Sequence, residues 1–283
     1  MACWRTEPPI SPAPGLPLFQ GWRCDGPVLA ACASALVAYY LGTVQYRRLR
    51  GRRWPAARWW WFAAGTASAL IAIESPLDAA GDSRFAPHMV QHLILTDISA
   101  PCILLGGPLL LLLSVGPNRV ARAVVLFLNG TVGRVLTFPA LTWTIFIVTL
   151  WTLHYSGFFE LALESESVHV LEHAIFLSAA LLFWLSIVGV GPTPWAGNAL
   201  AHPMRMVYLL VAMPAEAMLG FTLNGARHIL YRHYAGAGLA DQQAAGEIMW
   251  IGGSLCMFVA FMLVGLDWAK HEQRLGERAD QLA

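Results

Sequence analysis

The chain has 283 residues, of which 57% are hydrophobic and 12% charged, and its formal net charge is +1. A soluble domain carries about 25% charged residues, so this chain has too few to cover a soluble fold of its length. The same numbers exclude a disordered chain, a coiled coil and a disulfide-rich secreted scaffold, and the balanced charge gives no reason to expect nucleic acid as a partner. The composition predicts an integral membrane protein.

The spacing of the cysteines argues against two further kinds of chemistry. The five cysteines form no CxxC or CxxCH motif, so neither thioredoxin-like chemistry nor a covalently attached c-type haem is expected. Residues 1–27 are rich in Pro and Gly and lack a basic region followed by an apolar one, which differs from a signal peptide. We therefore expect an extracytoplasmic tail over 1–27, a membrane domain over 28–268 and a cytoplasmic tail over 269–283.

Seven stretches approach the roughly 20 apolar residues that a helical membrane span requires. They are Val28–Tyr46, Trp59–Leu77, Pro87–Val115, Phe138–Tyr155, His169–Val190, Met204–Leu223 and Ala244–Trp268. The third contains Pro101 and Gly106-Gly107-Pro108, and its halves are too short to cross separately, so we expect one kinked span. Arg119–Phe138 alternates arginines with apolar residues, as in a short interfacial helix. The predicted fold is an all-α bundle of seven transmembrane helices.

The arginines predict the orientation of this bundle. Thirteen of the 18 Lys and Arg residues fall in the loops and tail on one side, and the first loop alone, residues 47–58, holds six arginines. The other side has five. Because cytoplasmic loops carry the excess of Lys and Arg, we expect the N-terminus outside and the C-terminus in the cytoplasm.

The histidines are distributed unevenly across this topology. Seven of the nine lie at the expected outer side: His88, His92, His154, His169, His173, His228 and His233. Only His202 and His271 are expected at the cytoplasmic side. This polarised distribution indicates that any chemistry is located at the outer rim.

Histidine spacing suggests a metal site. His88 with His92, and His169 with His173, are i, i+4 pairs, which a helix places on one face. One such pair is usually solvated at a membrane rim, whereas two pairs and His154 at the same level favour convergence on one ion. Imidazole suits zinc, copper, iron and nickel, and a thioether such as that of Met89 would favour Cu(I).

Several carboxylates lie at the same expected membrane level as these histidines. Asp78, Glu172 and Asp241 lie at the outer ends of expected spans, where they could accept the second N–H of metal-bound histidines; helix capping is the alternative for Asp78 and Asp241. Asp97 and Glu216 lie within spans. An intramembrane carboxylate is a functional hypothesis by default, and a protonated, hydrogen-bonded pair between helices is the alternative.

These residues resemble the membrane-integral cytochrome c oxidase assembly factors of the CtaG type. The resemblance extends from the second span to the seventh. It rests on the blocks Ser75-Pro76-Leu77-Asp78, His88-Met89-Val90-Gln91-His92, Glu172-His173 followed by Phe183-Trp184, and Asp241-Gln242-Gln243 followed by Ile248-Met249-Trp250. Asp97 departs from the pattern, since an apolar residue is expected there in relatives.

The resemblance implies a seven-span protein of the bacterial cytoplasmic membrane that helps to mature haem–copper oxidases without being an enzyme. Its expected cargo is copper as Cu(I), its expected partner is the oxidase catalytic subunit, and an extracytoplasmic copper donor would precede it. The ligands it implies are His88, His92, His154, His169 and His173. Asp78 and Asp241 are the supporting polar groups it implies, and the residue pattern adds Glu172, Met89 and Asp97.

Two other functions remain open from the sequence. A membrane zinc hydrolase would use the same histidines with an open coordination position. A bis-histidine haem protein would need ligands deep enough to enclose a porphyrin. The sequence argues against a retinal protein, because the single lysine, Lys270, lies beyond the seventh expected span.

Overall fold

A computed structural model of the chain describes residues 21–23, 25–189 and 200–281. These residues form helices joined by turns and short loops, and no strand occurs among them, so the all-α prediction is confirmed. The expected N-terminal tail lies largely outside the described residues. The structure therefore addresses the membrane domain and the C-terminal segment.

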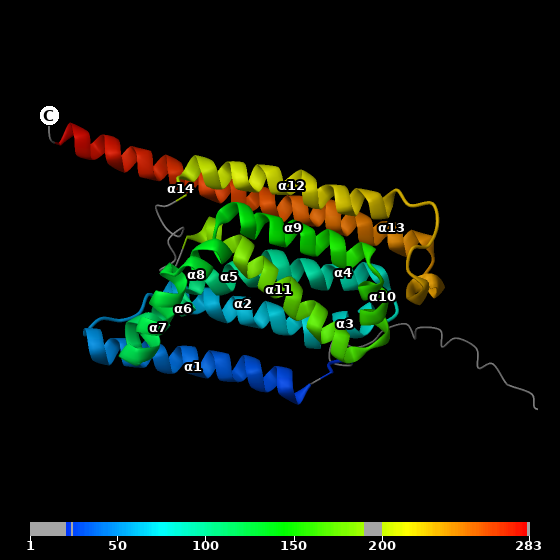
Figure 1. Ribbon diagram of the computed structural model, residues 1–283, viewed down its shortest axis with the longest axis horizontal. Coiled ribbons are helices and arrows are strands. Elements are labelled where there is room, and N and C mark those ends of the chain that lie inside the picture. Colours follow the sequence, from blue (N-terminus) through cyan, green and yellow to red (C-terminus); the bar gives the residue numbers. More distant parts are fainter. Residues whose placement is uncertain (1–20, 24, 190–199, 282–283) are drawn as a thin grey trace, which may run out of the picture.

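The long helices run side by side (Figure 1). The longest uninterrupted ones are α1 (Gly26–Arg50), α2 (Ala56–Glu74), α9 (Pro139–Tyr155), α11 (Glu166–Val188), α12 (His202–Asn224) and α14 (Ser254–Asp280). The last continues past the end of the expected seventh span, so the described part of the 269–283 tail is helical. It extends from the bundle as a rod (Figure 1).

Five helical stretches in the described part of the chain are long and apolar enough to cross a membrane: Gly26–Arg50, Phe85–Val115, Glu166–Val188, His202–Asn224 and Leu239–Asp280. Helices α9 and α10 (Gly157–Glu164) would add a sixth if they count together, although they meet at a bend of 70°. The chain is thus a multi-pass membrane protein. The count of seven spans, which requires α2 as well, stays a prediction.

The third expected span is interrupted where its glycines are. It consists of α4 (Phe85–Leu93), the π-helix η1 (Ile94–Ser99), α5 (Ala100–Gly106) and α6 (Pro108–Val115). Gly107 joins the last two with φ of 63°, a left-handed conformation that a side chain disfavours. One interrupted span therefore replaces a straight helix, as predicted.

A second π-helix, η4 (Ile248–Gly253), joins α13 (Leu239–Glu247) to α14. It packs against the third span: a Cβ added at Gly252 would lie 2.8 Å from Cδ1 of Leu93. Helix α12 makes an even closer contact with α13 and η4. A Cβ added at Gly220 would lie 2.5 Å from the backbone nitrogen of Trp250 in η4, and one added at Gly246 in α13 would lie 2.4 Å from the backbone nitrogen of Asn224. Small residues allow helix backbones in membranes to touch in this way.

The two ends of the bundle differ in their residues, and we name them accordingly. The histidine end contains α3 (Pro76–Gly81), α10 and the short 3-10 helix η3 (Arg232–Gly236); the arginine end contains the loop 51–55, α7 (Asn118–Asn129), α8 (Thr131–Leu136) and the C-terminus. They lie at the right and the left of Figure 1. The single helix expected over Arg119–Phe138 is instead two helices, α7 and α8, interrupted at Gly130, and none of the residues of α7 is buried.

Candidate metal centre

The two predicted histidine pairs meet at the histidine end. α4 and α11 both begin there, so each presents its pair within the first turns. The ring centroids of His88 and His92 are 4.4 Å apart, and those of His169 and His173 are 4.3 Å apart. Between the helices, His88 lies 5.1 Å from His169 and His92 lies 5.4 Å from His173. Four imidazoles from two helices thus form one cluster.

His154 joins this cluster from the last turn of α9. Its ring centroid lies 5.9 Å from that of His92. Its Nδ1 is 2.7 Å from the Leu150 carbonyl oxygen, and since a carbonyl only accepts, Nδ1 carries the proton and donates it. Nε2 is then left with its lone pair available, as in many metal-ligating histidines.

The cluster is buried and most of its polar atoms have no partner. His88, His92, His154 and His173 are at most 6% exposed, and Glu172 is fully buried. Buried atoms without a hydrogen-bond partner in the described residues are His88 Nε2, both ring nitrogens of His92, Nε2 of His154, His169 and His173, and both carboxyl oxygens of Glu172. Native structures leave few buried polar groups unsatisfied. This donor set fits a metal ion.

Two groups of three donor atoms in the described chain lie within 4.8 Å of one another. One is formed by His88, His169 and His173, and the other by His88, His92 and Glu172. His88 belongs to both, and His154 belongs to neither. Glu172, expected to support a histidine, offers a ligand atom of its own: its Oε2 lies 3.9 Å from His88 Nε2.

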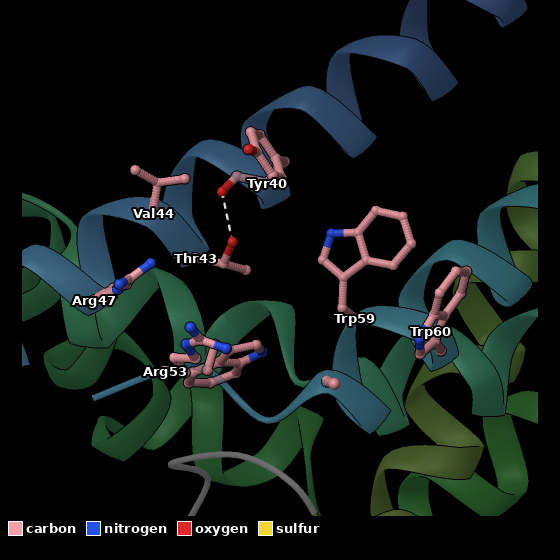
Figure 2. Close-up of a pocket in the computed structure, with 9 residues that line it drawn as sticks. Tyr40, Thr43, Val44, Arg47, Arg53, Trp59 and Trp60 are labelled. Atoms are coloured by element: carbon pink, nitrogen blue, oxygen red, sulfur yellow. Dashed lines mark hydrogen bonds between the residues drawn. The ribbon is translucent and has the colours of Figure 1, made fainter.

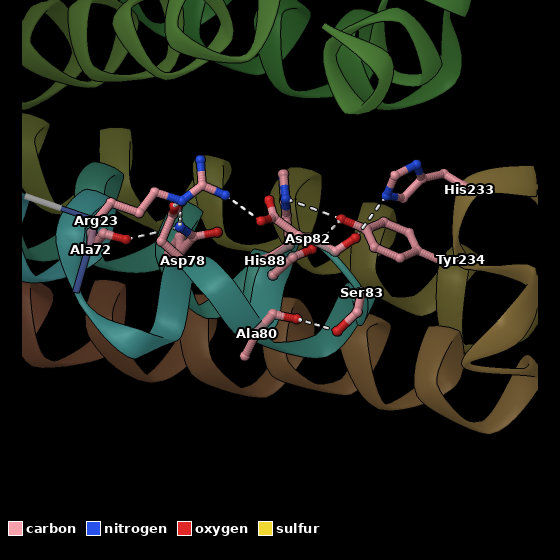
Figure 3. Close-up of polar contacts among 11 residues, drawn as sticks. Arg23, Ala72, Asp78, Ala80, Asp82, Ser83, His88, His233 and Tyr234 are labelled. Atoms are coloured by element: carbon pink, nitrogen blue, oxygen red, sulfur yellow. Dashed lines mark hydrogen bonds and ion pairs between the residues drawn. The ribbon is translucent and has the colours of Figure 1, made fainter. Parts of the chain in front are cut away.

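A tyrosine that the sequence reasoning missed sets the orientation of His88. The Tyr234 hydroxyl donates to the Gly81 carbonyl oxygen at 2.8 Å and lies 3.2 Å from His88 Nδ1 (Figure 3). A hydroxyl has one proton, so its oxygen accepts from Nδ1–H of His88. The other ring nitrogen, Nε2, therefore presents its lone pair next to Glu172.

Phenylalanines also absent from the sequence prediction form the wall of the cluster. The ring of Phe159 lies 5.5 Å from that of His88 and 5.6 Å from that of His154, and the ring of Phe176 lies 4.5 Å from that of His92. Both phenylalanines are fully buried. They exclude water, and the low dielectric constant they create strengthens any charge interaction inside.

Asp78, expected as a supporting group, lies in a polar layer beside the cluster rather than against a histidine. It accepts a hydrogen bond of 2.6 Å from Gln91 Nε2 and forms an ion pair with Arg23, which also pairs with Asp82 (Figure 3). Burial raises the pKa of Asp78 to about 6, against the opposing effects of Gln91 and Arg23. The aspartate thus ties the segment before α1 to α3 and α4.

Asp241 supports the site by capping α4. Its carboxylate accepts from the backbone N–H of Phe85 at 2.6 Å and of Ala86 at 3.4 Å, and it pairs with Arg84 at 3.3 Å. A carboxylate at a helix N-terminus satisfies free N–H groups and interacts favourably with the helix dipole. Asp241 is therefore a helix cap, the alternative considered from the sequence. Helix α4, which it caps, carries His88 in its first turn.

The remaining predicted supporting residues lie away from the imidazoles. Met89 is buried in the hydrophobic core. Asp97 lies in η1, where it contacts Thr96 and Glu216 of α12. One carboxyl oxygen of Asp97 and one of Glu216 have no partner among the described residues, and the two carboxyl groups are within hydrogen-bonding reach of each other. The intramembrane carboxylates thus form a pair between helices.

The other histidines follow the predicted division. His233 lies at the histidine end, where its Nε2 is 2.7 Å from the Asp82 carbonyl oxygen (Figure 3). His202 and His271 lie together on α12 and α14 with ring centroids 5.3 Å apart, and His202 contacts Asp267. That second pair is at the arginine end, separate from the cluster.

The fold and the site define a multi-pass helical membrane protein with a buried imidazole cluster at one end of the bundle. Residues 37–271 match the family described as cytochrome c oxidase caa3 assembly factor, and the chain belongs to this family. The resemblance found in the sequence motifs is thereby confirmed.

The chain is also similar to longer mycobacterial proteins described as uncharacterised. It is 26% identical over 277 residues to a protein of Mycobacterium bovis, covering 93% of this chain and 41% of that protein. It is 24% identical over 280 residues to a protein of Mycobacterium leprae, covering 94% of this chain and 42% of that protein. The chain thus spans about two fifths of the length of these relatives. No solved structure matches it significantly.

Proposed function

We propose that this protein binds Cu(I) in the imidazole cluster and supplies it to the catalytic subunit of a haem–copper cytochrome c oxidase. The observation that supports the proposal is the convergence of buried imidazole nitrogens without partners in a chain that belongs to a family of oxidase assembly factors. Copper is here a cargo, and no turnover is required of the site.

The charge of the cluster favours a monovalent ion. The donors are uncharged imidazoles and one carboxyl group, Glu172, surrounded by phenylalanines. The ideal cost of moving an ion out of water grows with the square of its charge, so Cu(I) costs about one quarter of what Zn(II) costs. One carboxylate balances Cu(I) completely, whereas Zn(II) would leave a positive charge in a dry site.

His88 would be the central ligand, because it belongs to both groups of donor atoms. His169 is only partly buried, so it lies where an incoming ion would first meet the cluster. His92 lies one turn after His88 on α4, and His154 lies in the last turn of α9. Glu172 would balance the charge of the ion. This division of roles allows an ion to be taken up and passed on within one group of ligands.

We further propose that the histidine end faces the outside of the bacterial cytoplasmic membrane. The excess of arginines at the opposite end supports this orientation. Copper would then arrive from an extracytoplasmic donor, and transfer to the oxidase would take place between neighbouring helical bundles. The seven-span topology belongs to the same proposal.

A bis-histidine haem fits the geometry less well. It requires two imidazoles on opposite faces of a porphyrin. The facing rings of His88 and His169 are stacked 5.1 Å apart, and Phe159 and Phe176 pack against the same cluster. A macrocycle would have to displace these aromatic side chains, which are fully buried.

Metal analysis of the detergent-purified protein tests the proposal. The parent is loaded anaerobically with Cu(I) or with Zn(II), and the variant His88→Ala/His92→Ala is compared with the control His202→Ala/His271→Ala. We expect the parent and the control to retain Cu(I) and the first variant to lose it. Equal Cu(I) retention by both variants would show that the cluster is structural. Retention of Zn(II) alone would favour the membrane hydrolase, and lipid turnover would be measured next.

A deletion strain tests the delivery step. The oxidase polypeptide and its haem should remain, the oxidase copper site should be empty, and excess copper in the medium should restore part of the activity by mass action. The His88→Ala/His92→Ala gene should behave like the deletion and the His202→Ala/His271→Ala gene like the parent. An oxidase with full copper content in the deletion strain would exclude delivery.

A further inference from the structure

A cavity of about 380 Å³ lies at the arginine end, between the last turns of α1 and the start of α2. Figure 2 shows its lining residues on both helices and on the loop that joins them. The residues that line it are Tyr40, Thr43, Val44, Arg47, Arg53, Trp54, Ala56, Trp59 and Trp60. Its volume falls within the range of about 300–1,000 Å³ of small-molecule sites.

The cavity carries positive charge without local compensation. Between Asp25 and Glu74 the chain holds six arginines and no acidic residue. No ion pair within the described part of the chain involves Arg47 or Arg53, the two arginines of the cavity. The neighbouring Arg58 lies over the ring of Trp54 at 5.0 Å. The two guanidinium groups of the cavity are therefore available to an anion.

The cavity also has an apolar side that is open to the surroundings of the bundle. Trp60 is 68% exposed and Tyr40 is 55% exposed, and only 6% of the most apolar window of α1 is buried. Since α1 is a candidate membrane span, this exposed surface faces lipid acyl chains. Tryptophan and tyrosine rings are typical of the headgroup level of a bilayer.

One residue in the wall of the cavity, Trp54, is hydrogen-bonded to the bundle. The indole N–H of Trp54 donates to the Tyr39 hydroxyl at 2.8 Å, and that hydroxyl donates to the Gly106 carbonyl oxygen at 2.7 Å. Tyr39 also stacks on Phe62 with ring centroids 4.2 Å apart. These contacts tie Trp54, in the loop after α1, through Tyr39 to α2 and α5.

We infer that this cavity binds the phosphate headgroup of an anionic phospholipid, with Arg47 and Arg53 on the phosphate and Trp59, Trp60 and Tyr40 against the glycerol and upper acyl region. Guanidinium groups form paired hydrogen bonds with phosphate, and the apolar side of the cavity continues into the lipid-facing surface of α1. A soluble anion would gain nothing from that continuation. The inference does not depend on the metal centre.

The chain offers a matched control for the test. Arg48 and Arg50 lie on the same last turn of α1, are exposed, and do not line the cavity. The variants Arg47→Gln/Arg53→Gln and Arg48→Gln/Arg50→Gln therefore lose the same charge at the same membrane level. Helicity and elution as a single species verify that both remain folded.

Each protein is incorporated into nanodiscs of phosphatidylcholine with a minor fraction of phosphatidylglycerol, extracted mildly, and its retained lipid is measured by mass spectrometry. We expect the parent and the Arg48/Arg50 variant to enrich phosphatidylglycerol. We expect the Arg47/Arg53 variant to lose about tenfold of that enrichment, because it removes both guanidinium groups that line the cavity and would pair with the phosphate. An equal loss in both variants would show unspecific surface attraction and overturn the site.

A second arm separates the lipid from free phosphate. Inorganic phosphate is added to the delipidated parent and thermal unfolding is followed, with short-chain phosphatidylglycerol in parallel. We expect the lipid, and not inorganic phosphate, to raise the unfolding temperature of the parent and of the Arg48/Arg50 variant. Equal stabilisation by inorganic phosphate would make the ligand a soluble anion and overturn the proposal.

Discussion

The two ends of the bundle differ in whether their polar side chains are buried or exposed. At the histidine end, imidazoles and Glu172 are buried behind aromatic rings. At the arginine end, most of the arginines of the first loop are exposed. The difference follows from the cost of burial: an imidazole can be buried as a neutral group, whereas a guanidinium stays charged and must remain hydrated or paired. The uneven distribution of histidines along the sequence therefore also separates buried, neutral polar groups at one end of the bundle from exposed, charged groups at the other.

Packing also differs between the helix contacts inside the bundle and the helices at its periphery. Near the histidine end, Gly220 and Gly246 bring α12 and α13 into backbone contact. Near the arginine end, α1 contributes a single buried residue, Tyr39, and α14 continues beyond the bundle with exposed residues (Figure 1). Substitutions at the contact between α12 and α13 should therefore cost more than equivalent ones on the projecting part of α14.

The largest effect is expected for Gly220→Val. An added Cβ would lie 2.5 Å from the backbone nitrogen of Trp250, so the helices must separate, at a cost of about 3 kcal/mol or more. Gly276→Val on the projecting part of α14 is the matched control, because nothing lies within 4 Å of its added Cβ. Thermal unfolding in detergent measures both. Similar unfolding temperatures for the two variants would remove the packing contrast.

Next in size is the effect of Tyr234→Phe on metal affinity. The change removes the oxygen that accepts Nδ1–H of His88, so the ring can adopt the tautomer that blocks Nε2. Loss of such a supporting group typically weakens metal binding about 10–100-fold. Tyr231→Phe is the control, because its hydroxyl donates only to the His154 carbonyl oxygen at 2.8 Å. Cu(I) competition titrations should separate the two variants; equal affinities would mean that Tyr234 is only structural.

A smaller effect concerns pH and Asp78. Its folded-state pKa of about 6 lies above the ordinary 3.8 because of burial. The folded state therefore binds the proton more readily, and the contribution of Asp78 to the free energy of unfolding is fully present below about pH 4 and is lost as the pH rises through about 6. The expected change is on the order of 2 kcal/mol. Unfolding temperatures of the parent and of Asp78→Asn between pH 4 and 7 measure it; parallel curves would contradict it.

The smallest effect is expected for Asp241→Ala, which removes the cap of α4 at a cost of about 1 kcal/mol. Asp241→Asn keeps an acceptor oxygen and should restore most of the loss. Amide hydrogen exchange at Phe85 and Ala86 reports the cap directly. Unchanged exchange in the alanine variant would show that α4 begins without help from Asp241.

The sequence predicted the parts of the site that obey local periodicity. The i, i+4 spacing and the alternation of span directions were enough to bring the pairs His88/His92 and His169/His173 to one level. The residues that surround and support these histidine pairs follow no local periodicity. Tyr234 and Phe159 lie in or beside short helices between the spans, where the path of the chain decides which side chain reaches the cluster. Asp241 contacts Phe85 across 156 residues, a distance that no local pattern encodes.

The helical class of the fold was predictable from the sequence, whereas the π-helical segments and the length of the last helix were not. Long apolar stretches predicted the helices, and Gly107 with its neighbouring proline predicted the interruption of the third span. The π-helical segments were not predicted, because a single additional residue in a turn leaves the hydrophobic pattern nearly unchanged. The continuation of α14 to Asp280 was also missed, since an exposed helix after a span carries no apolar signal.

The π-helices η1 and η4 have a consequence for how this chain tolerates changes of length. A π turn holds one residue more than the α turn that it replaces. Deleting one residue within Ile94–Ser99 or within Ile248–Gly253 would therefore regularise the helix while leaving both flanking faces in register. A deletion one turn earlier, within α4, would instead rotate His88 away from its partners by about 100°. Gaps between related sequences should accordingly occur mainly in these two segments, where the length of the chain can change without disturbing the imidazole cluster.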